Sequence, residues 1–154
     1  MTHSHTVRSA TADATRQLGY LIGQLLPARA IITLVGPLGA GKTTFVQGVV
    51  KARTDDQVTS PTFVYHQRYG TSDAPVDHID LYRLQTTPDE LAKTGVLELL
   101  EDVPGWLIIE WPLETLPYPN DVTRLSITAT GQPDYAFQLE TDDSALAERL
   151  REII

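Results

Sequence analysis

The stretch GPLGAGKTT, residues Gly36–Thr44, decides the fold of this chain. It follows a continuous apolar and β-branched run, AIITLV at Ala30–Val35, which is typical of a strand buried on both faces. From Lys42 to about Ala52, apolar residues recur at helical spacing. The loop between them matches G-x-x-x-x-G-K-[ST], so strand, loop and helix predict a site for the phosphates of a nucleoside triphosphate.

The loop residues have separate expected roles. Backbone N–H groups at its glycines converge on phosphate oxygens, and the following helix adds its positive N-terminal end. Lys42 is expected to reach the β- and γ-phosphates, and the Thr43 hydroxyl is expected to coordinate Mg²⁺. The predicted nucleotide-binding residues of the loop are Gly39, Ala40, Gly41, Lys42, Thr43 and Thr44.

A Mg²⁺-nucleotide site also requires a carboxylate at the end of a neighbouring buried strand. Glu110 closes the apolar run WLIIE, and Asp80 lies in HIDLYR, where an acid is costly to bury without a metal or an arginine. The alternatives are a solvated Glu110 and a salt bridge from Asp80 to Arg83. Trp111 follows Glu110 directly and is expected either to cover the nucleotide site or to be an ordinary half-buried core residue.

A third candidate segment lies after the helix of the glycine loop. Many P-loop proteins keep a segment that senses the γ-phosphate at this point in the chain. A hydroxyl here is suited to ligate Mg²⁺ or to orient the attacking water, and the alternative is an ordinary Ser-Pro turn. The residues of this predicted switch are Thr59, Ser60, Pro61 and Thr62.

The remaining periodicity completes an α/β fold of one domain, residues 1–154, of the three-layer, P-loop NTPase-like class. We expect a mostly parallel central sheet with an antiparallel C-terminal hairpin around Gly131–Asp134, and ligands at the carboxyl ends of its strands. Residues 1–8, with His3 and His5, are interpreted as a mobile terminus without a metal. Further elements are predicted as helices at Thr11–Leu26, Pro88–Leu100 and about Leu146–Ile153, and as strands at Phe63–Tyr69 and Val76–Tyr82.

Composition narrows the function classes. The formal net charge is −8, from 12 basic and 20 acidic residues, which disfavours a stand-alone nucleic-acid binder. There is no cysteine, so disulfides and thiolate metal sites are excluded. No apolar run approaches the roughly 18 residues that a membrane span needs, and we expect a cytoplasmic protein that does not contact a membrane.

Four motifs together, GPLGAGKTTF, SPTFVYHQRY, HIDLYRL and IIEWP, resemble the bacterial TsaE (YjeE) family of small P-loop ATPases. The family's usual loop reads GDLGAGKT, and Pro37 replaces its acidic residue, away from the phosphate-binding positions. The resemblance implies that Thr43 and Glu110 hold Mg²⁺ and that Asp80 supports the metal or the catalytic water. It also implies that SPTF acts as a switch and that Thr15 lies near the base or ribose.

The same resemblance implies ATP and Mg²⁺ as cofactors and a role in forming threonylcarbamoyladenosine at position 37 of tRNA. The implied partners are the TsaB and TsaD proteins, and tRNA is contacted only through their complex. Two alternatives stay open: a small-molecule kinase, and a nucleotide-sensing module that hydrolyses nothing. No N-K-x-D run specifies guanine and no arginine finger is identifiable, so the choice of ATP rests on the resemblance and hydrolysis by the isolated chain is expected to be slow.

Overall fold

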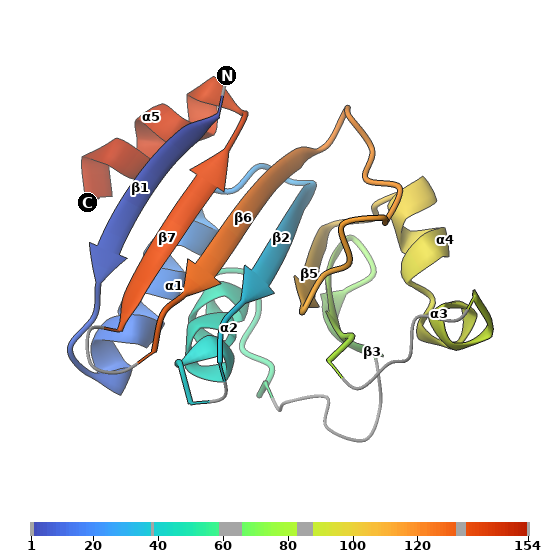
Figure 1. The fold of residues 1–154 in the computed structure, drawn as a ribbon, viewed down its shortest axis with the longest axis horizontal. Coiled ribbons are helices and arrows are strands. Elements are labelled where there is room, and N and C mark those ends of the chain that lie inside the picture. The colour runs from blue at the N-terminus through green and yellow to red at the C-terminus, as the bar shows by residue number, and fades with distance from the viewer. Residues whose placement is uncertain (1, 38, 59–65, 83–87, 132–134, 154) are drawn as a thin grey trace.

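The computed structural model describes residues 2–37, 39–58, 66–82, 88–131 and 135–153. In this part of the chain a single sheet of seven strands runs in the order β1-β7-β6-β2-β5-β4-β3 (Figure 1). The strands are β1 (His3–Arg8), β2 (Ala30–Val35), β3 (His66–Thr71), β4 (Ala74–Asp80), β5 (Trp106–Glu110), β6 (Thr123–Ala129) and β7 (Ala136–Thr141). The helices are α1 (Ala12–Leu25), α2 (Lys42–Lys51), α3 (Pro88–Thr94), α4 (Val96–Glu101) and α5 (Ser144–Ile153).

The centre of the sheet is parallel and its margins are antiparallel, which confirms the predicted fold class. β6, β2, β5 and β4 pair in parallel, whereas β1, β7 and β6 on one side and β3 and β4 on the other pair antiparallel. The predicted C-terminal hairpin is β6 and β7, and its first strand lies directly against β2, with Ala30 opposite Thr123. The carboxyl ends of β2, β5 and β4 therefore lie at the same edge of the sheet.

Two apolar cores lie on opposite faces of this sheet. One joins α1, α2 and α5 to β2, β5, β6 and β7, with Phe45, Phe137 and Ile32 fully buried in it. The other joins α4 to β2, β4 and β5, through Ile31 and Leu107 among others. The alternating directions of side chains along a strand explain this division, because Ile31 and Ile32 are neighbours in sequence but face opposite cores.

Helices α1 and α2 touch through their backbones. A Cβ added at Gly48 would lie 2.1 Å from the carbonyl oxygen of Arg16, and one added at Gly19 would lie 2.3 Å from that of Phe45. Only glycine permits such an approach. Since α2 begins at the glycine loop, this contact holds the start of α1 close to that loop.

Three sequence predictions differ from the structure. Residues 3–8, interpreted as part of a mobile terminus, form the edge strand β1, because β7 offers them a full antiparallel ladder. The single helix predicted over Pro88–Leu100 is two helices divided at Gly95, whose φ of 75° is left-handed and ends the helical path. The strands predicted at Phe63–Tyr69 and Val76–Tyr82 are instead His66–Thr71 and Ala74–Asp80, so both lie closer to the tight turn that joins them. Residues 63–65 and most of the Gly131–Asp134 turn lie outside the described residues.

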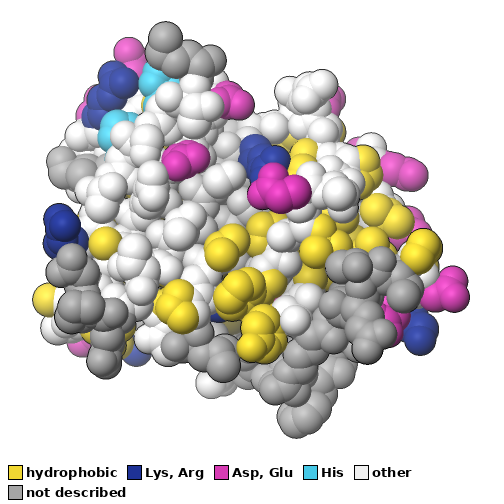
Figure 2. Space-filling model, in the orientation of Figure 1, with side chains coloured by type: hydrophobic (Ala, Val, Ile, Leu, Met, Phe, Trp, Pro, Cys, Tyr) yellow, Lys and Arg dark blue, Asp and Glu magenta, His cyan; other side chains and the backbone are white. Residues whose placement is uncertain are grey.

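Figure 2 shows the face of the sheet opposite α1 and α2. Over β7 and β6 this face is mostly white, the colour of uncharged polar side chains and backbone, and no helix crosses this face of the two strands in Figure 1. Apolar side chains gather in the lower middle of the view. In the described part of the chain, no helix has the length and apolar character that crossing a bilayer requires.

A buried ion pair links the two strands of the β3–β4 hairpin. The side chain of Asp77 is 0% exposed, and Arg68 donates to it through two nitrogens, at 2.8 and 3.1 Å. His66 Nε2 lies 2.6 Å from the same carboxylate. Burial alone would raise the pKa of Asp77, but the hydrogen bonds from His66 and Arg68 outweigh it and hold this pKa below its usual value.

This pair predicts an acid-sensitive contribution to stability. A carboxyl whose pKa is lower in the folded state stabilises the fold above its unfolded pKa, about 3.9, and this contribution is lost as the pH falls through the folded pKa. We expect Asp77→Asn to lower the free energy of unfolding by about 2 kcal/mol at neutral pH, and by less below about pH 3.5. Urea unfolding at neutral pH and below about pH 3.5 measures the free energy of unfolding of each variant, with Asp73→Asn in the exposed turn as the control. An Asp77 effect of equal size at both pH values would contradict it.

Candidate functional site

The glycine loop leaves the carboxyl end of β2 and enters α2 with an open helix terminus. Gly41 is the N-cap of α2 and has φ 91°, and Gly39 has φ 79°, a left-handed region that glycine adopts without strain. No side chain caps the first turn of α2. The backbone N–H groups of this turn are therefore available to an anion, and the helix dipole favours negative charge there.

Lys42, the first residue of α2, turns back across the loop. Its side chain is 7% exposed, its Nζ donates to the carbonyl oxygen of Gly36, and the same nitrogen lies 4.2 Å from the centre of the Trp111 ring. Burial lowers the pKa of Lys42, and the negative charges of Glu110 and Asp80 oppose this shift. An ammonium group has three N–H donors and the bond to Gly36 uses one, so the others can meet phosphate oxygens.

The two predicted carboxylates meet at the edge of the sheet. β4 and β5 pair in parallel with Asp80 opposite Glu110, so both acids end their strands beside the loop. Glu110 is 3% exposed. Its burial excludes the alternative of a solvated residue at a strand end.

Asp80 has a less favourable environment for its charge. Burial raises the pKa of Asp80, and the neighbouring charge of Glu110 raises it further, against the hydrogen bond from the backbone N–H of Tyr82 and the charge of Lys42. The Tyr82 nitrogen lies 2.9 Å from Asp80 Oδ1. Two carboxylates that lie opposite each other and interact electrostatically favour a cation between or beside them. Arg83, the alternative partner, lies outside the described residues.

His78 reaches the carboxylate of Glu110 from the next strand. Its Nε2 lies 2.6 Å from Glu110 Oε2, and its side chain is 0% exposed. His78 carried no predicted role. The sequence could have indicated His78 through the alternation along β4, because residues 78 and 80 point to the same face of the sheet.

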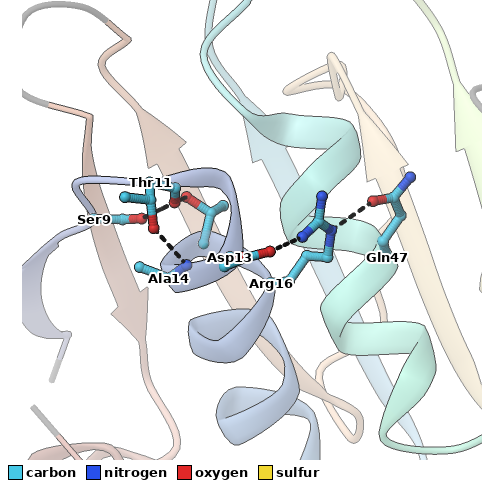
Figure 3. A network of polar contacts seen from close by, with 7 residues as sticks. Ser9, Thr11, Asp13, Ala14, Arg16 and Gln47 are labelled. Carbon is cyan, nitrogen blue, oxygen red and sulfur yellow. Dashed lines mark hydrogen bonds and ion pairs between the residues drawn. The ribbon is translucent and has the colours of Figure 1, made fainter.

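A cleft of about 270 Å³ opens on the other side of the loop. Thr15 is buried beside it in the first turns of α1, and its Oγ1 lies 2.5 Å from the Oγ of Ser9, a second residue that sequence reasoning missed. Thr11 caps the start of α1: its hydroxyl accepts from the N–H of Ala14 at 3.0 Å (Figure 3). The cleft is lined in part by Ser9, Thr11, Thr15, Gly39, Gly41 and Thr44.

A polar link between the helices lies close to this cleft. Arg16 contacts Asp13 within α1 and also donates from Nε to Gln47 Oε1 of α2 at 3.3 Å (Figure 3). The link and the glycine contact between α1 and α2 hold Thr15 against the loop, as its predicted place near the nucleotide requires.

Trp111 covers one side of the loop. It has φ 55°, an uncommon value for a residue other than glycine, and its N–H donates to the carbonyl oxygen of Leu34 at 3.0 Å. Its ring lies over Lys42 and 5.0 Å from the ring of Tyr82, which is 48% exposed. This position beside Lys42 favours the prediction that Trp111 covers the nucleotide site over the alternative of an ordinary core residue.

The structure thus brings together most of the residues singled out in the sequence. Lys42, Glu110 and Asp80 meet at the carboxyl ends of the strands, with Thr43 in the adjoining first turn of α2. The proposed switch, Thr59–Thr62, lies outside the described residues and stays a prediction. Within the described ranges no group of three or more His, Asp or Glu side chains forms a metal site, so a cation here would need ligands from a bound phosphate or from water.

A family model and curated relatives agree on one family. The family model described as threonylcarbamoyl adenosine biosynthesis protein TsaE matches residues 9–137. A tRNA threonylcarbamoyladenosine biosynthesis protein TsaE from Nostoc sp. is 41% identical over 124 residues, covering 77% of this chain and 75% of the relative. The protein of the same name from Synechocystis sp. is 41% identical over 107 residues, 68% of each chain. The crystal structure of YdiB from Bacillus subtilis has a TM-score of 0.70 at 20% identity, covers 100% of this chain and 99% of its own, and shows the same fold.

Proposed function

This chain belongs to the TsaE family of threonylcarbamoyl adenosine biosynthesis proteins, and we propose that it binds and hydrolyses Mg²⁺-ATP in support of threonylcarbamoyl transfer to adenosine 37 of tRNA. The observation that carries the proposal is the arrangement of three groups around one loop. The open N-terminus of α2, the buried ammonium of Lys42 and the paired carboxylates of Asp80 and Glu110 lie at a single edge of the sheet.

The residues present fit a Mg²⁺-nucleotide. The backbone from Gly39 to Gly41 and the first turn of α2 would bind the phosphates, with Lys42 on the β- and γ-phosphates. Thr43 and Glu110 would hold Mg²⁺, and Asp80 would support the metal or orient the attacking water. Bound Mg²⁺ would neutralise charge on the transferred phosphoryl group. The Thr59–Thr62 switch belongs to this proposal as a prediction.

The cleft beside Thr15 would receive the ribose or base. Thr15 is held in place by Ser9 and by the carbonyl oxygen of Thr11, to which its hydroxyl donates at 3.1 Å. The cleft joins this side of α1 to Gly41 and Thr44, so a nucleotide with its phosphates on the loop would extend into it. No feature of the cleft selects adenine, and ATP follows from the family.

Slow turnover by the isolated chain is part of the proposal. Arg68 is engaged with Asp77, and Arg124 lies over the ring of Tyr118, at 3.7 Å from its centre. A charge-stabilising group would then come from partners or from closure around the nucleotide. The net charge of −8 supports action on the TsaB and TsaD proteins, with tRNA contacted only through them, in the cytoplasm.

The test is the steady-state rate of ATP hydrolysis at fixed Mg²⁺, for this chain alone and with the TsaB and TsaD proteins of its organism. We expect a low rate that rises several-fold when both partners are present. Tight nucleotide binding with no turnover in either condition would favour a non-hydrolysing sensor. Phosphoryl transfer to a small acceptor would favour a kinase, and absence of nucleotide binding would overturn the site itself.

A further inference from the structure

We propose that His78 is a positioning residue for Glu110: it holds one carboxylate oxygen, so that the other faces the Mg²⁺-nucleotide. This inference rests on the proposed function. The inference goes beyond the proposed function by assigning a role to a side chain that would touch neither the metal nor the phosphates.

The register of the sheet explains how the two side chains meet. In the parallel ladder, His78 lies opposite Ile108 and Asp80 lies opposite Glu110. His78 is therefore the diagonal neighbour of Glu110 on the same face, one step back from the edge of the sheet. From there its Nε2 reaches Glu110 Oε2 at 2.6 Å. The contact engages Oε2 and leaves Oε1 outside this hydrogen bond.

The hydrogen-bonding capacity of the two groups sets the direction of the bond. An ionised carboxylate only accepts hydrogen bonds, so Nε2 of His78 carries the proton and donates. Nδ1 is buried and has no partner among the described residues, which agrees with a nitrogen that bears no hydrogen. In the described part of the chain no other group donates to the side-chain carboxylate of Glu110. Among the described residues, the position of this carboxylate thus depends on one histidine.

Burial makes this dependence strong. Glu110 is 3% exposed and His78 is 0% exposed, so water cannot readily replace the histidine. Without that donor, a buried carboxylate must find another, and Lys42 is a cation whose charge already acts on Glu110. Loss of His78 would let Glu110 leave the position that faces the metal, so the loss would fall on Mg²⁺ binding. Partners that orient ligating carboxylates typically change metal affinity or activity by about 10- to 100-fold.

The test compares His78→Gln with His78→Asn. The amide nitrogen of Gln can lie close to the place of Nε2, whereas that of Asn lies close to the place of Nδ1 and falls short of Glu110. Both variants bury a neutral amide, so their folding costs are matched. The readout is the affinity for a non-hydrolysable ATP analogue, measured with Mg²⁺ and with EDTA, and the ratio of the two affinities gives the metal's contribution.

We expect the Gln variant to keep the wild-type ratio within a few-fold, and the Asn variant to lower it by about 10- to 100-fold with little change in EDTA. Hydrolysis by the Asn variant should require correspondingly more Mg²⁺. A folded Asn variant with the wild-type ratio would overturn the role of His78 alone. A wild-type protein whose nucleotide binding does not respond to Mg²⁺ would overturn the proposed metal site, and this inference with it.

A second measurement needs no variant. With ¹⁵N-labelled histidine, NMR of the wild-type protein identifies which imidazole nitrogen of His78 carries hydrogen. We expect Nε2–H, with a shift that changes when Mg²⁺ is added to the nucleotide complex. Protonation at Nδ1 only, with Nε2 bare, would overturn the inference even if the Asn variant failed to fold.

Discussion

Replacing Glu110 with Gln is expected to reduce Mg²⁺-dependent ATP turnover by about 100-fold or more, with nucleotide affinity in EDTA unchanged. The substitution keeps the shape of the side chain and removes its charge. Glu110 closes β5 beside the loop, buried and held by His78, so the loss falls on the metal and on the charge that develops during phosphoryl transfer. Single-turnover hydrolysis and analogue binding, measured on the same sample, separate the two effects.

Glu98→Gln is the matched control for this variant. Glu98 is exposed in α4, away from the loop, and its substitution should leave turnover unchanged. If Glu110→Gln and the wild type hydrolyse ATP at the same background rate, Glu110 does not support the chemistry and the sensor alternative gains support. If Glu110→Gln also loses nucleotide binding in EDTA, the carboxylate is needed for the structure of the site and not only for the metal.

The second large effect is expected for Lys42→Met. This change keeps the length of the side chain and removes the ammonium, so we expect binding of ATP to weaken by about 10- to 100-fold and turnover to fall by at least about 100-fold. Charge-assisted hydrogen bonds to phosphate oxygens are strong, and Lys42 is buried where water competes poorly for them. Isothermal titration and steady-state hydrolysis measure the two quantities.

Stability distinguishes this loss from unfolding. Burial disfavours the charged form of Lys42, the same cause that lowers its pKa, so a neutral side chain of similar size should not destabilise the fold. The unfolding midpoint of Lys42→Met is expected near that of the wild type. Lys51→Met, on the exposed last residue of the same helix, should leave binding intact. Equal losses in both lysine variants would argue against a specific phosphate contact.

Local patterns in the sequence sufficed for the elements that carry the proposed site. The bounds of β2 and β5 agree with the prediction, because strands buried on both faces are continuous apolar runs that glycine, proline or charge interrupts. The start of α2 at Lys42 also agrees, because the glycines before it mark the turn from strand to helix. These features depend on residues close together in the chain.

Elsewhere, local patterns failed where a distant partner decides the structure. The segment His3–Arg8 is polar at most positions and indicates no strand by itself, yet β7 pairs with it along its length. Gly95 divides a segment whose apolar spacing predicted one helix, because its left-handed conformation redirects the chain between α3 and α4. Propensity is a weak guide when tertiary contacts compensate for it.

The sequence alone therefore determined the glycine loop, the strands β2 and β5 beside it and the glutamate that ends β5, because each of these depends on consecutive residues. Only the tertiary structure decided which side chains meet across the sheet. His78 and Glu110 are 32 residues apart and touch because β4 and β5 pair in one particular register. Thr15 lies beside the loop because two helices approach at glycines. Strand register and helix packing are set by the burial of entire apolar faces of the sheet and the helices. These faces are built from residues far apart in the chain, so no short stretch of sequence determines them.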